Sequence, residues 1–230
     1  MIADQTVEFP EAVTLLGGGA AEPARLRAAL TLAPRLVAAD GGANMAVAEG
    51  LSPDLVIGDF DSASAETLAR IPADRQMRLA EQDTTDFDKC LSRIAAPFVL
   101  GLGFLGPRFD HTLAVFSALV RHAAKLCLLV GGEDVIFAAP PQLRIELAPG
   151  SRLSLFPMCP VSGESTGLRW PIDGLAFAPD GVIGTSNEVT GPVDLRMDGP
   201  GMLVILPAAA LGPALRALRS GPRWPSPGGR

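Results

Sequence analysis

The chain has 230 residues, of which 48% are hydrophobic and 19% are charged, and its formal net charge is −6. This length and composition predict a folded protein with a sizeable core, in one large or two smaller domains, and exclude a disordered chain. The negative net charge argues against nucleic acid or an anionic membrane surface as the main partner, so a phosphate ligand would need a metal or local arginines.

Three cysteines, Cys90, Cys127 and Cys159, are widely spaced and lack the paired spacing of a zinc site or a disulfide framework. The N-terminal stretch is acidic and lacks the basic, apolar pattern of a signal peptide. No apolar run reaches the roughly 18 residues that a membrane-spanning helix needs. We therefore expect a soluble, unprocessed protein of the cytoplasm.

Short apolar runs alternate with helical segments through the first 132 residues. This alternation predicts an α/β fold with a doubly wound, mainly parallel, Rossmann-like sheet. Strands are predicted at 13–16, 36–39, 55–57, 76–80, 98–102 and 125–130, and helices at 25–30, 43–49, from 64, at 87–94 and at 111–122.

Polar side chains gather in the loops that follow these predicted strands. Open α/β sheets bind their ligands at the carboxyl ends of the strands, so these loops are the candidate site. They carry Asp40, Asp59, Asp61, Gln82, Asp86, Arg108 and Asp110. A Gly17–Gly19 run after the first strand either approaches a phosphate or makes a turn, since it lacks the full Gly-x-x-x-x-Gly-Lys loop.

Asp59 and Asp61 directly follow the apolar run 55–57. In an extended segment their side chains would point the same way, because side chains alternate with period two. Magnesium takes oxygen ligands and is usually held by one or two carboxylates plus substrate phosphates. With a third carboxylate from Asp83 or Asp86, the sequence predicts a magnesium–phosphate site.

After about residue 132 the helical periodicity gives way to short strand-like runs separated by Gly and Pro. These runs, at 134–137, 143–147, 152–156, 193–197 and 202–206, predict an all-β domain, a small sandwich. The last stretch predicts a short helix at 213–219 and then a frayed tail. The predicted domains are a nucleotide- and metal-binding α/β domain at 1–132, a β-sandwich domain at 133–207 and a tail at 208–230.

Several motifs occur in the order and at the spacing of a known family, and the chain resembles thiamine pyrophosphokinase, also called thiamine diphosphokinase. The resemblance covers nearly the whole chain, and the motifs are specific only when taken together. They are Ala39–Asn44, Gly58–Ser62, Gln82–Phe87, Leu105–His111, Gly167–Pro171 and Thr185–Glu188.

The resemblance implies transfer of a diphosphoryl group from ATP to thiamine, giving thiamine diphosphate and AMP, with Mg²⁺ required. It also implies a homodimer with active sites at the subunit interface. Carried over by position, the implied metal ligands are Asp59, Asp61 and Asp86, and the implied ATP contacts are Asp40, Gln82, Thr85 and Arg108. The implied thiamine contacts are Asn44, Asp110, Trp170, Ser186 and Asn187, and the implied catalytic residues are Asp59, Asp61, Asp86, Arg108 and Asp110.

These roles also make chemical sense. Phosphoryl-type transfer depends chiefly on positioning the nucleophile and neutralising charge on the transferred oxygens, which a metal and an arginine can do. Asp110 would orient the thiamine hydroxyl or accept its proton, with His111 as the next candidate. The face of Trp170 suits a flat cation such as thiamine.

Structural roles are open for the same residues. Asp86 could cap the helix that follows it, and Asp40 could stabilise the turn at the two following glycines. Arg108 could form a structural ion pair, and Trp170 could pack in the core of the β domain.

Two other functions are also open. A magnesium-dependent phosphohydrolase would use Asp59 as a nucleophile and Asp61 as an acid or base, but it leaves the motifs at 84–86 and 108–111 unexplained and requires a phospho-enzyme. A non-catalytic protein that binds thiamine or a nucleotide would not need the set of metal carboxylates.

Overall fold

The computed structural model describes residues 6–81 and 83–226, so the predicted ATP contact Gln82 lies outside the described residues. The chain divides into two compact units. The first unit comprises residues up to Ala118 with Leu129–Gly131, and the second comprises Leu119–Leu128 with the residues from Gly132 onward. The domain boundaries predicted from the sequence, at 132 and 207, stay a prediction.

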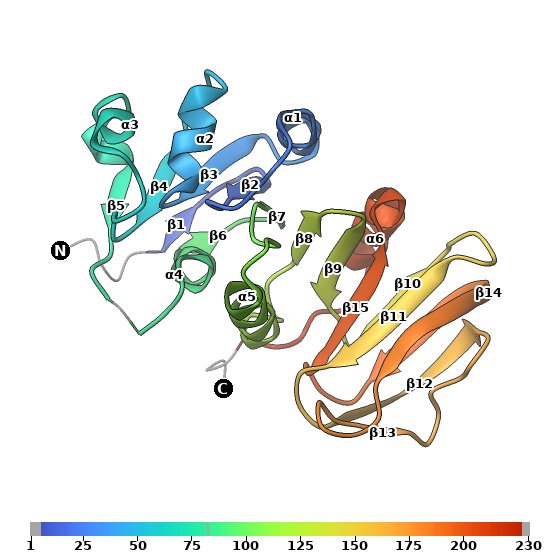
Figure 1. Ribbon diagram of the computed structural model, residues 1–230. Helices are drawn as coiled ribbons and strands as arrows, with labels where there is room; N and C mark the ends of the chain where they lie inside the picture. The colour runs from blue at the N-terminus through green and yellow to red at the C-terminus, as the bar shows by residue number, and fades with distance from the viewer. Residues whose placement is uncertain (1–5, 82, 227–230) are drawn as a thin grey trace. The chain divides into compact units, whose positions relative to one another are not determined.

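The first unit is built on a parallel sheet (Figure 1). Its strands are continuous apolar runs because both faces of the sheet are covered, and the residues of β2 and β4 are all buried. The order across the sheet is β7 (Val99–Leu102), β2 (Val13–Leu16), β3 (Arg35–Ala39), β4 (Leu55–Gly58) and β5 (Gln76–Arg78), with β8 (Cys127–Gly131) beside β7.

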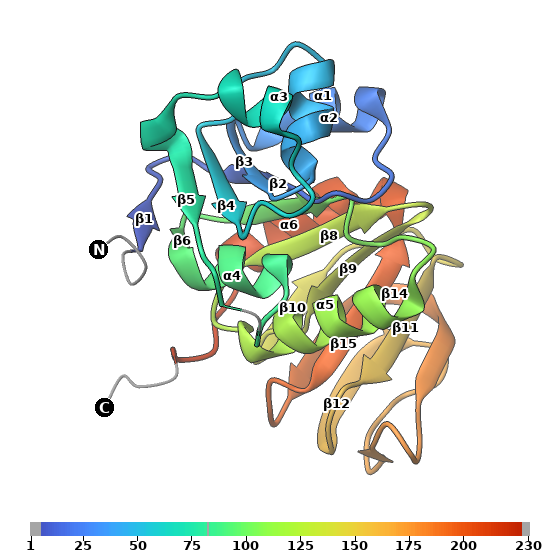
Figure 2. The same ribbon diagram turned by 60° about the vertical axis from the view of Figure 1, so that its left-hand side comes forward.

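Helices cover both faces of this sheet: α1, α2 and α3 lie on one side, and α4 and α5 on the other (Figures 1 and 2). Two of them, α3 and α4, begin at ordinary side-chain caps. The Ser64 side chain accepts a hydrogen bond from the Thr67 amide at α3, and Thr85 accepts one from the Asp88 amide at α4. The bounds are α1 (Pro23–Leu32), α2 (Gly42–Ala48), α3 (Ala65–Ala69), α4 (Asp86–Arg93) and α5 (Phe109–Arg121).

The strand order creates a switch point beside β2. The chain runs outward from β2 to β5 and then returns to β7 on the other side of β2. Loops that leave β2 and β7 therefore diverge, which leaves a crevice at the carboxyl ends of the strands. Glycine is needed where these loops approach each other, because a Cβ on Gly103, where φ is +74°, would lie 2.6 Å from the Gly17 carbonyl oxygen.

The second unit is an antiparallel β structure with one helix. Its long strand β14 (Gly184–Met197) pairs with β11 through its first part and with β10 and β12 through its second part. The predicted fold class, a parallel α/β region followed by an antiparallel β region, is confirmed. The other elements are β9 (Asp134–Ala138), β10 (Gln142–Ile145), β11 (Arg152–Pro157), β12 (Val161–Leu168), β13 (Ala176–Phe177), β15 (Met202–Pro207) and α6 (Leu211–Ser220).

The C-terminal segment is ordered through the last described residues, so the expectation of a frayed tail is wrong there. Helix α6 packs against β10. Beyond it, the Trp224 indole Nε1–H donates a hydrogen bond of 2.8 Å to the Ala139 carbonyl. Among the described helices, none combines the length and the apolar character that crossing a membrane requires.

Candidate functional site

A cavity of about 700 Å³ lies in the first unit, where the loops after β2, β3, β4 and β7 meet the starts of α4 and α5. Sequence analysis expected ligands at these carboxyl ends, and most of the predicted residues of this unit line the cavity. They are Asn44, Asp59, Asp61, Thr85, Asp86 and Arg108, with His111 beside them.

The two aspartates of the first acidic loop come together, but not in the way the sequence argument assumed. Strand β4 ends at Gly58, and Phe60 has a left-handed backbone with φ of +66°. The extended alternation expected for Asp59 and Asp61 is therefore wrong, because a turn separates them. Their carboxylate oxygens still lie within 4.8 Å of each other and of an Asp40 oxygen.

Asp40 directly follows β3, is buried, and forms hydrogen bonds with the backbone of this loop. Its carboxylate accepts hydrogen bonds from the Ser62 amide at 3.3 Å and the Ala63 amide at 2.8 Å. Burial is the largest cause that raises the pKa of Asp40 to about 6, and the two backbone amides oppose it. Asp40 is thus a further candidate metal ligand, while its implied contact with ATP stays a prediction.

Asn44, one helical turn further on, contacts the same loop. Its amide nitrogen donates to the Ser62 carbonyl and its amide oxygen accepts from the Ser64 amide, both at 2.9 Å. Both polar ends of the side chain are therefore engaged by backbone. Its implied contact with thiamine stays a prediction.

Lys89 on α4 is a site residue that the sequence analysis missed. Only 3% of its side chain is exposed, and its Nζ lies 3.6 Å from Asp59 Oδ2 and 3.4 Å from Asp86 Oδ1. Burial raises the pKa of Asp86, which Lys89 opposes. The available signal was a lysine one helical turn after Asp86. Asp86 does not cap α4, because Thr85 does.

Arg108 lines the cavity, whereas Asp110 is not one of its lining residues and contacts the Arg108 guanidinium. The guanidinium donates to both carboxylate oxygens, at 3.3 and 2.7 Å, and both side chains are about two-thirds exposed. The Arg108 hydrogen bond lowers the pKa of Asp110, so this carboxyl is ionised at neutral pH. The geometry allows the pair to open towards a ligand, since neither group is buried.

The donor chemistry of the cavity fits a hard divalent cation. Three carboxylates meet in one place, and a fourth, Asp86, contacts the same buried lysine as Asp59. Oxygen donors of this kind suit a magnesium-like ion better than a soft metal. The acidic cluster could therefore hold a metal.

The predicted thiamine contacts lie in the second unit. Trp170 is 54% exposed, which rules out the alternative that it is a core residue. Asn187 is buried and fixes its backbone, accepting from the Trp170 amide at 3.2 Å and donating to its carbonyl at 2.7 Å. The Arg169 guanidinium lies 5.0 Å from the Trp170 ring centre, so this ring already interacts with a cation. Ser186 has a left-handed backbone with φ of +60°.

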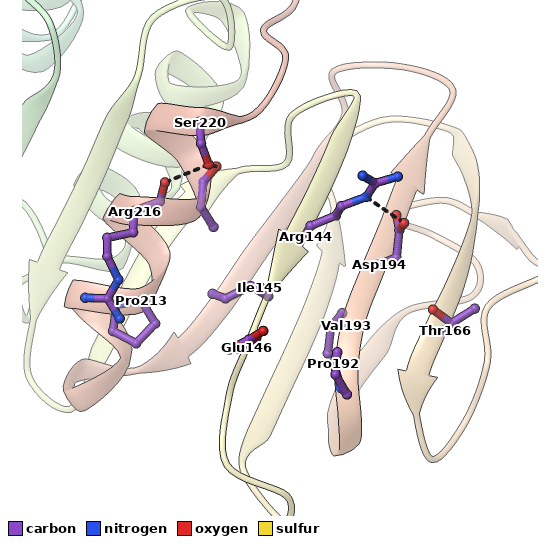
Figure 3. Close-up of a pocket in the computed structure, with 11 residues that line it drawn as sticks. Arg144, Ile145, Glu146, Thr166, Pro192, Val193, Asp194, Pro213, Arg216 and Ser220 are labelled. Carbon is purple, nitrogen blue, oxygen red and sulfur yellow. Dashed lines mark hydrogen bonds and ion pairs between the residues drawn. The ribbon is translucent and has the colours of Figure 1, made fainter.

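A second cavity, of about 560 Å³, lies in the second unit between α6 and strands β10 and β14 (Figure 3). Arg144 donates to Asp194 at 3.0 Å, and Gln142 donates to the same carboxylate at 2.8 Å. Arg216 and Glu146 also line it, so its positive and negative side chains balance. This cavity lacks the cluster of carboxylates found in the first unit. We therefore place the candidate reaction site in the cavity of the first unit.

Comparisons with known proteins give the family of both parts of the chain. Residues 26–129 match the family described as "Thiamin pyrophosphokinase, catalytic domain", and residues 142–200 match "Thiamin pyrophosphokinase, vitamin B1 binding domain". Thiamine pyrophosphokinase 1 of Oryza sativa is 32% identical over 188 residues, which cover 66% of this chain and 71% of the rice protein.

Solved structures share the fold. Thiamin pyrophosphokinase from Geobacillus thermodenitrificans superposes with a TM-score of 0.67 at 21% identity, over 85% of this chain and 96% of that one. The enzyme from Candida albicans gives 0.68 at 16% identity, over 88% and 92%. The chain belongs to the thiamin pyrophosphokinase family.

Proposed function

We propose that this protein transfers the diphosphoryl group of ATP to the hydroxyl of thiamine, giving thiamine diphosphate and AMP. The observation that carries this proposal is the cavity of the first unit, which places an acidic cluster, a buried lysine and an arginine around one space. Family membership supports the same activity. The chain is thus a thiamine diphosphokinase, EC 2.7.6.2.

The metal of this site is proposed to be Mg²⁺, held by Asp59, Asp61 and Asp86, with Asp40 as a further oxygen donor. When bound, it would neutralise charge on the phosphate oxygens. Lys89 adds a fixed positive charge to the wall of the cavity, because its Nζ is held between two carboxylates. Thr85 and Gln82 are proposed to lie near the nucleotide.

Arg108 is proposed to leave Asp110 and contact phosphate, which frees the carboxylate to receive the thiamine hydroxyl. The Arg108 hydrogen bond is what lowers the pKa of Asp110, so once Arg108 has moved away the carboxylate can orient the thiamine hydroxyl or accept its proton. His111, the next residue, lines the same cavity and is the second candidate to accept the proton.

Thiamine is proposed to stack on Trp170, with polar contacts from Ser186 and Asn187 and, on the cavity side, Asn44. The ring is exposed and its backbone is fixed by Asn187, so it is ready to receive a flat cation. We further propose a homodimer whose active sites combine residues of both subunits. Exposed apolar side chains of the second unit, Trp170, Leu175, Val182 and Ile183, support such an interface.

We propose that the protein is localised in the cytoplasm, which supplies ATP. The cysteines are free thiols, two of them buried, which suits a reducing compartment.

The decisive experiment measures AMP release from ATP and Mg²⁺, with and without thiamine, for the wild type and Asp59→Asn. We expect AMP only when thiamine is present, and a loss of at least about 100-fold in the variant, because a ligand for the transferred group's metal is removed. Asp74→Asn is the matched control, since Asp74 is an exposed acid outside the cavity.

Other outcomes separate the alternatives. Phosphate or ADP released without thiamine would indicate the phosphohydrolase. Thiamine binding without any turnover would indicate the non-catalytic binding protein.

A further inference from the structure

Asp59 and Asp61 are presented by a strained turn. Phe60, between them, has a φ of +66°, a conformation that residues other than glycine rarely adopt. Such a turn persists only where its surroundings determine it. The residues that hold this turn therefore also fix the separation of the two carboxylates.

Part of the support comes from the core. The Phe60 side chain packs against a buried cluster that includes Ala43, Val47 and Val56. This contact anchors the middle of the turn. It does not reach the polypeptide that leaves the turn, from Ser62 to Ser64, whose backbone groups need partners of their own.

Asn44 supplies partners on two sides of that segment. Its amide nitrogen donates to the Ser62 carbonyl and its oxygen accepts from the Ser64 amide, both at 2.9 Å. The Asn44 side chain on α2 therefore bridges the Ser62 carbonyl and the Ser64 amide, and we call these two hydrogen bonds the brace. Asp40 binds the Ser62 and Ala63 amides in the gap between.

We propose that Asn44 is a positioning residue, which braces the Ser62–Ser64 segment and thereby sets the geometry of the metal carboxylates Asp59 and Asp61. This inference rests on the metal site of the proposed function. It is separate from the thiamine contact implied for Asn44 by family resemblance, because the two backbone hydrogen bonds use one amide hydrogen and one lone pair of the oxygen and can be tested without thiamine.

The test is Asn44→Ala, with Mn²⁺ as the probe and free Mn²⁺ measured by electron paramagnetic resonance. Alanine is the better helix former, so α2 is expected to stay intact. In the absence of thiamine, we expect Mn²⁺ affinity to fall about 10- to 100-fold, as for other residues that orient metal ligands. Glu49→Ala is the matched control, since it removes only the 3.0 Å ion pair with Arg27 at the other end of α2.

Unchanged Mn²⁺ affinity in Asn44→Ala would overturn the proposal, whatever happens to the KM for thiamine. A wild type that binds Mn²⁺ but releases no thiamine-dependent AMP would refute the proposed function and leave the brace standing. The two failures are therefore distinguishable.

A second pair of variants changes Ser64, the backbone partner of Asn44, and leaves Asn44 itself intact. Ser64 has a φ of −67°, which proline also adopts, so Ser64→Pro removes the amide hydrogen that Asn44 accepts. Ser64→Ala keeps that hydrogen and loses only the hydroxyl that caps α3. We expect Ser64→Pro to bind Mn²⁺ more weakly than Ser64→Ala, and equal affinities would contradict the brace.

Discussion

Lys89 has almost no solvent contact, although lysine is seldom fully buried without a partner. Burying its charge is tolerable only because Asp59 and Asp86 compensate it. The consequence is that the cavity contains a cation of its own, held at a fixed point by the helix that carries it. A phosphate oxygen entering the cavity thus meets a positive charge that needs no rearrangement.

The pKa of Asp40, raised to about 6 mainly by burial, gives a pH prediction. The fold favours the protonated carboxyl, so this contribution to stability is complete below the ordinary pKa of 3.8 and is lost as pH rises through about 6. A metal needs the ionised form. We therefore expect Mn²⁺ affinity to fall about tenfold per pH unit below pH 6, in a titration from about pH 8 to 5.

Denaturant unfolding of the metal-free protein supplies the complementary measurement. Its free energy of unfolding should decrease between about pH 4 and 6 by an amount that is smaller in Asp40→Asn. A metal affinity that is flat across this range would show that Asp40 does not titrate there.

At the scale of elements, the segment that follows α6 is held by one hydrogen bond and one partly buried ring. Helix α6 packs on β10, and beyond it Trp224 is partly buried with its indole nitrogen bonded to the Ala139 carbonyl. This hydrogen bond places Trp224 beside Ala139, the residue that follows β9. The apolar periodicity of α6 was visible in the sequence, but this contact, 85 residues away along the chain, was not.

We expect Trp224→Ala to lower the free energy of unfolding by about 1 to 3 kcal/mol, from the lost hydrogen bond and the lost contact of the ring. Thiamine-dependent activity of the folded protein should be retained. Trp170→Ala is the opposite case, because its ring is exposed. Guanidinium denaturation of both variants checks this, and equal losses of stability would be inconsistent with the difference in burial.

The parallel half of the fold could be predicted because its strands are short apolar runs, and because α1 begins at a proline and α3 and α4 begin at side-chain caps. Strands β12 and β14 were missed or shortened for a physical reason. Val161–Leu168 is rich in Ser, Thr and Gly, and Gly191-Pro192 falls inside β14, where proline normally argues against a strand. The short pair β1 (Val7–Glu8) and β6 (Ile94–Ala95) carries too little pattern to predict.

Several residues that line the cavity could be predicted from the sequence, but their geometry could not. Asp59, Asp61 and Asp86 could be placed together because parallel strands end at one edge. The left-handed turn at Phe60 could not be foreseen, since an aromatic residue normally avoids it. Lys89 was missed because its spacing of one helical turn from Asp86 does not by itself show that a charged side chain is buried.

At the scale of the whole molecule, the two units carry different parts of the proposed reaction. The acidic cavity lies in the first unit, and the exposed Trp170 with its supporting Asn187 lies in the second. A substitution of Trp170 should therefore change the KM for thiamine without changing the affinity for the metal. Trp170→Ala should raise the KM for thiamine about 3- to 30-fold, as expected for a lost stacking and cation–π contact, with Mn²⁺ affinity unchanged.

The proposed dimer adds a test of how subunits share the site. If each active site combines the first unit of one subunit with the second unit of its partner, mixing Asp59→Asn with Trp170→Ala restores activity after subunit exchange. Random exchange makes about half of the dimers mixed, each with one intact site. At a thiamine concentration well below the wild-type KM, where Trp170→Ala alone is weakly active, about a quarter of wild-type activity is therefore expected. Mixtures no more active than their components would place each site within one subunit.

The packing of Phe60 on the core has a consequence for how this enzyme tolerates change. The aromatic ring between the two aspartates packs against buried aliphatic side chains that do not line the cavity. Repacking those side chains shifts the ring, and the ring's backbone sets the angle between the carboxylates. Conservative exchanges in this part of the interior therefore act as adjustments of the catalytic geometry, and folding and chemistry cannot be tuned independently here.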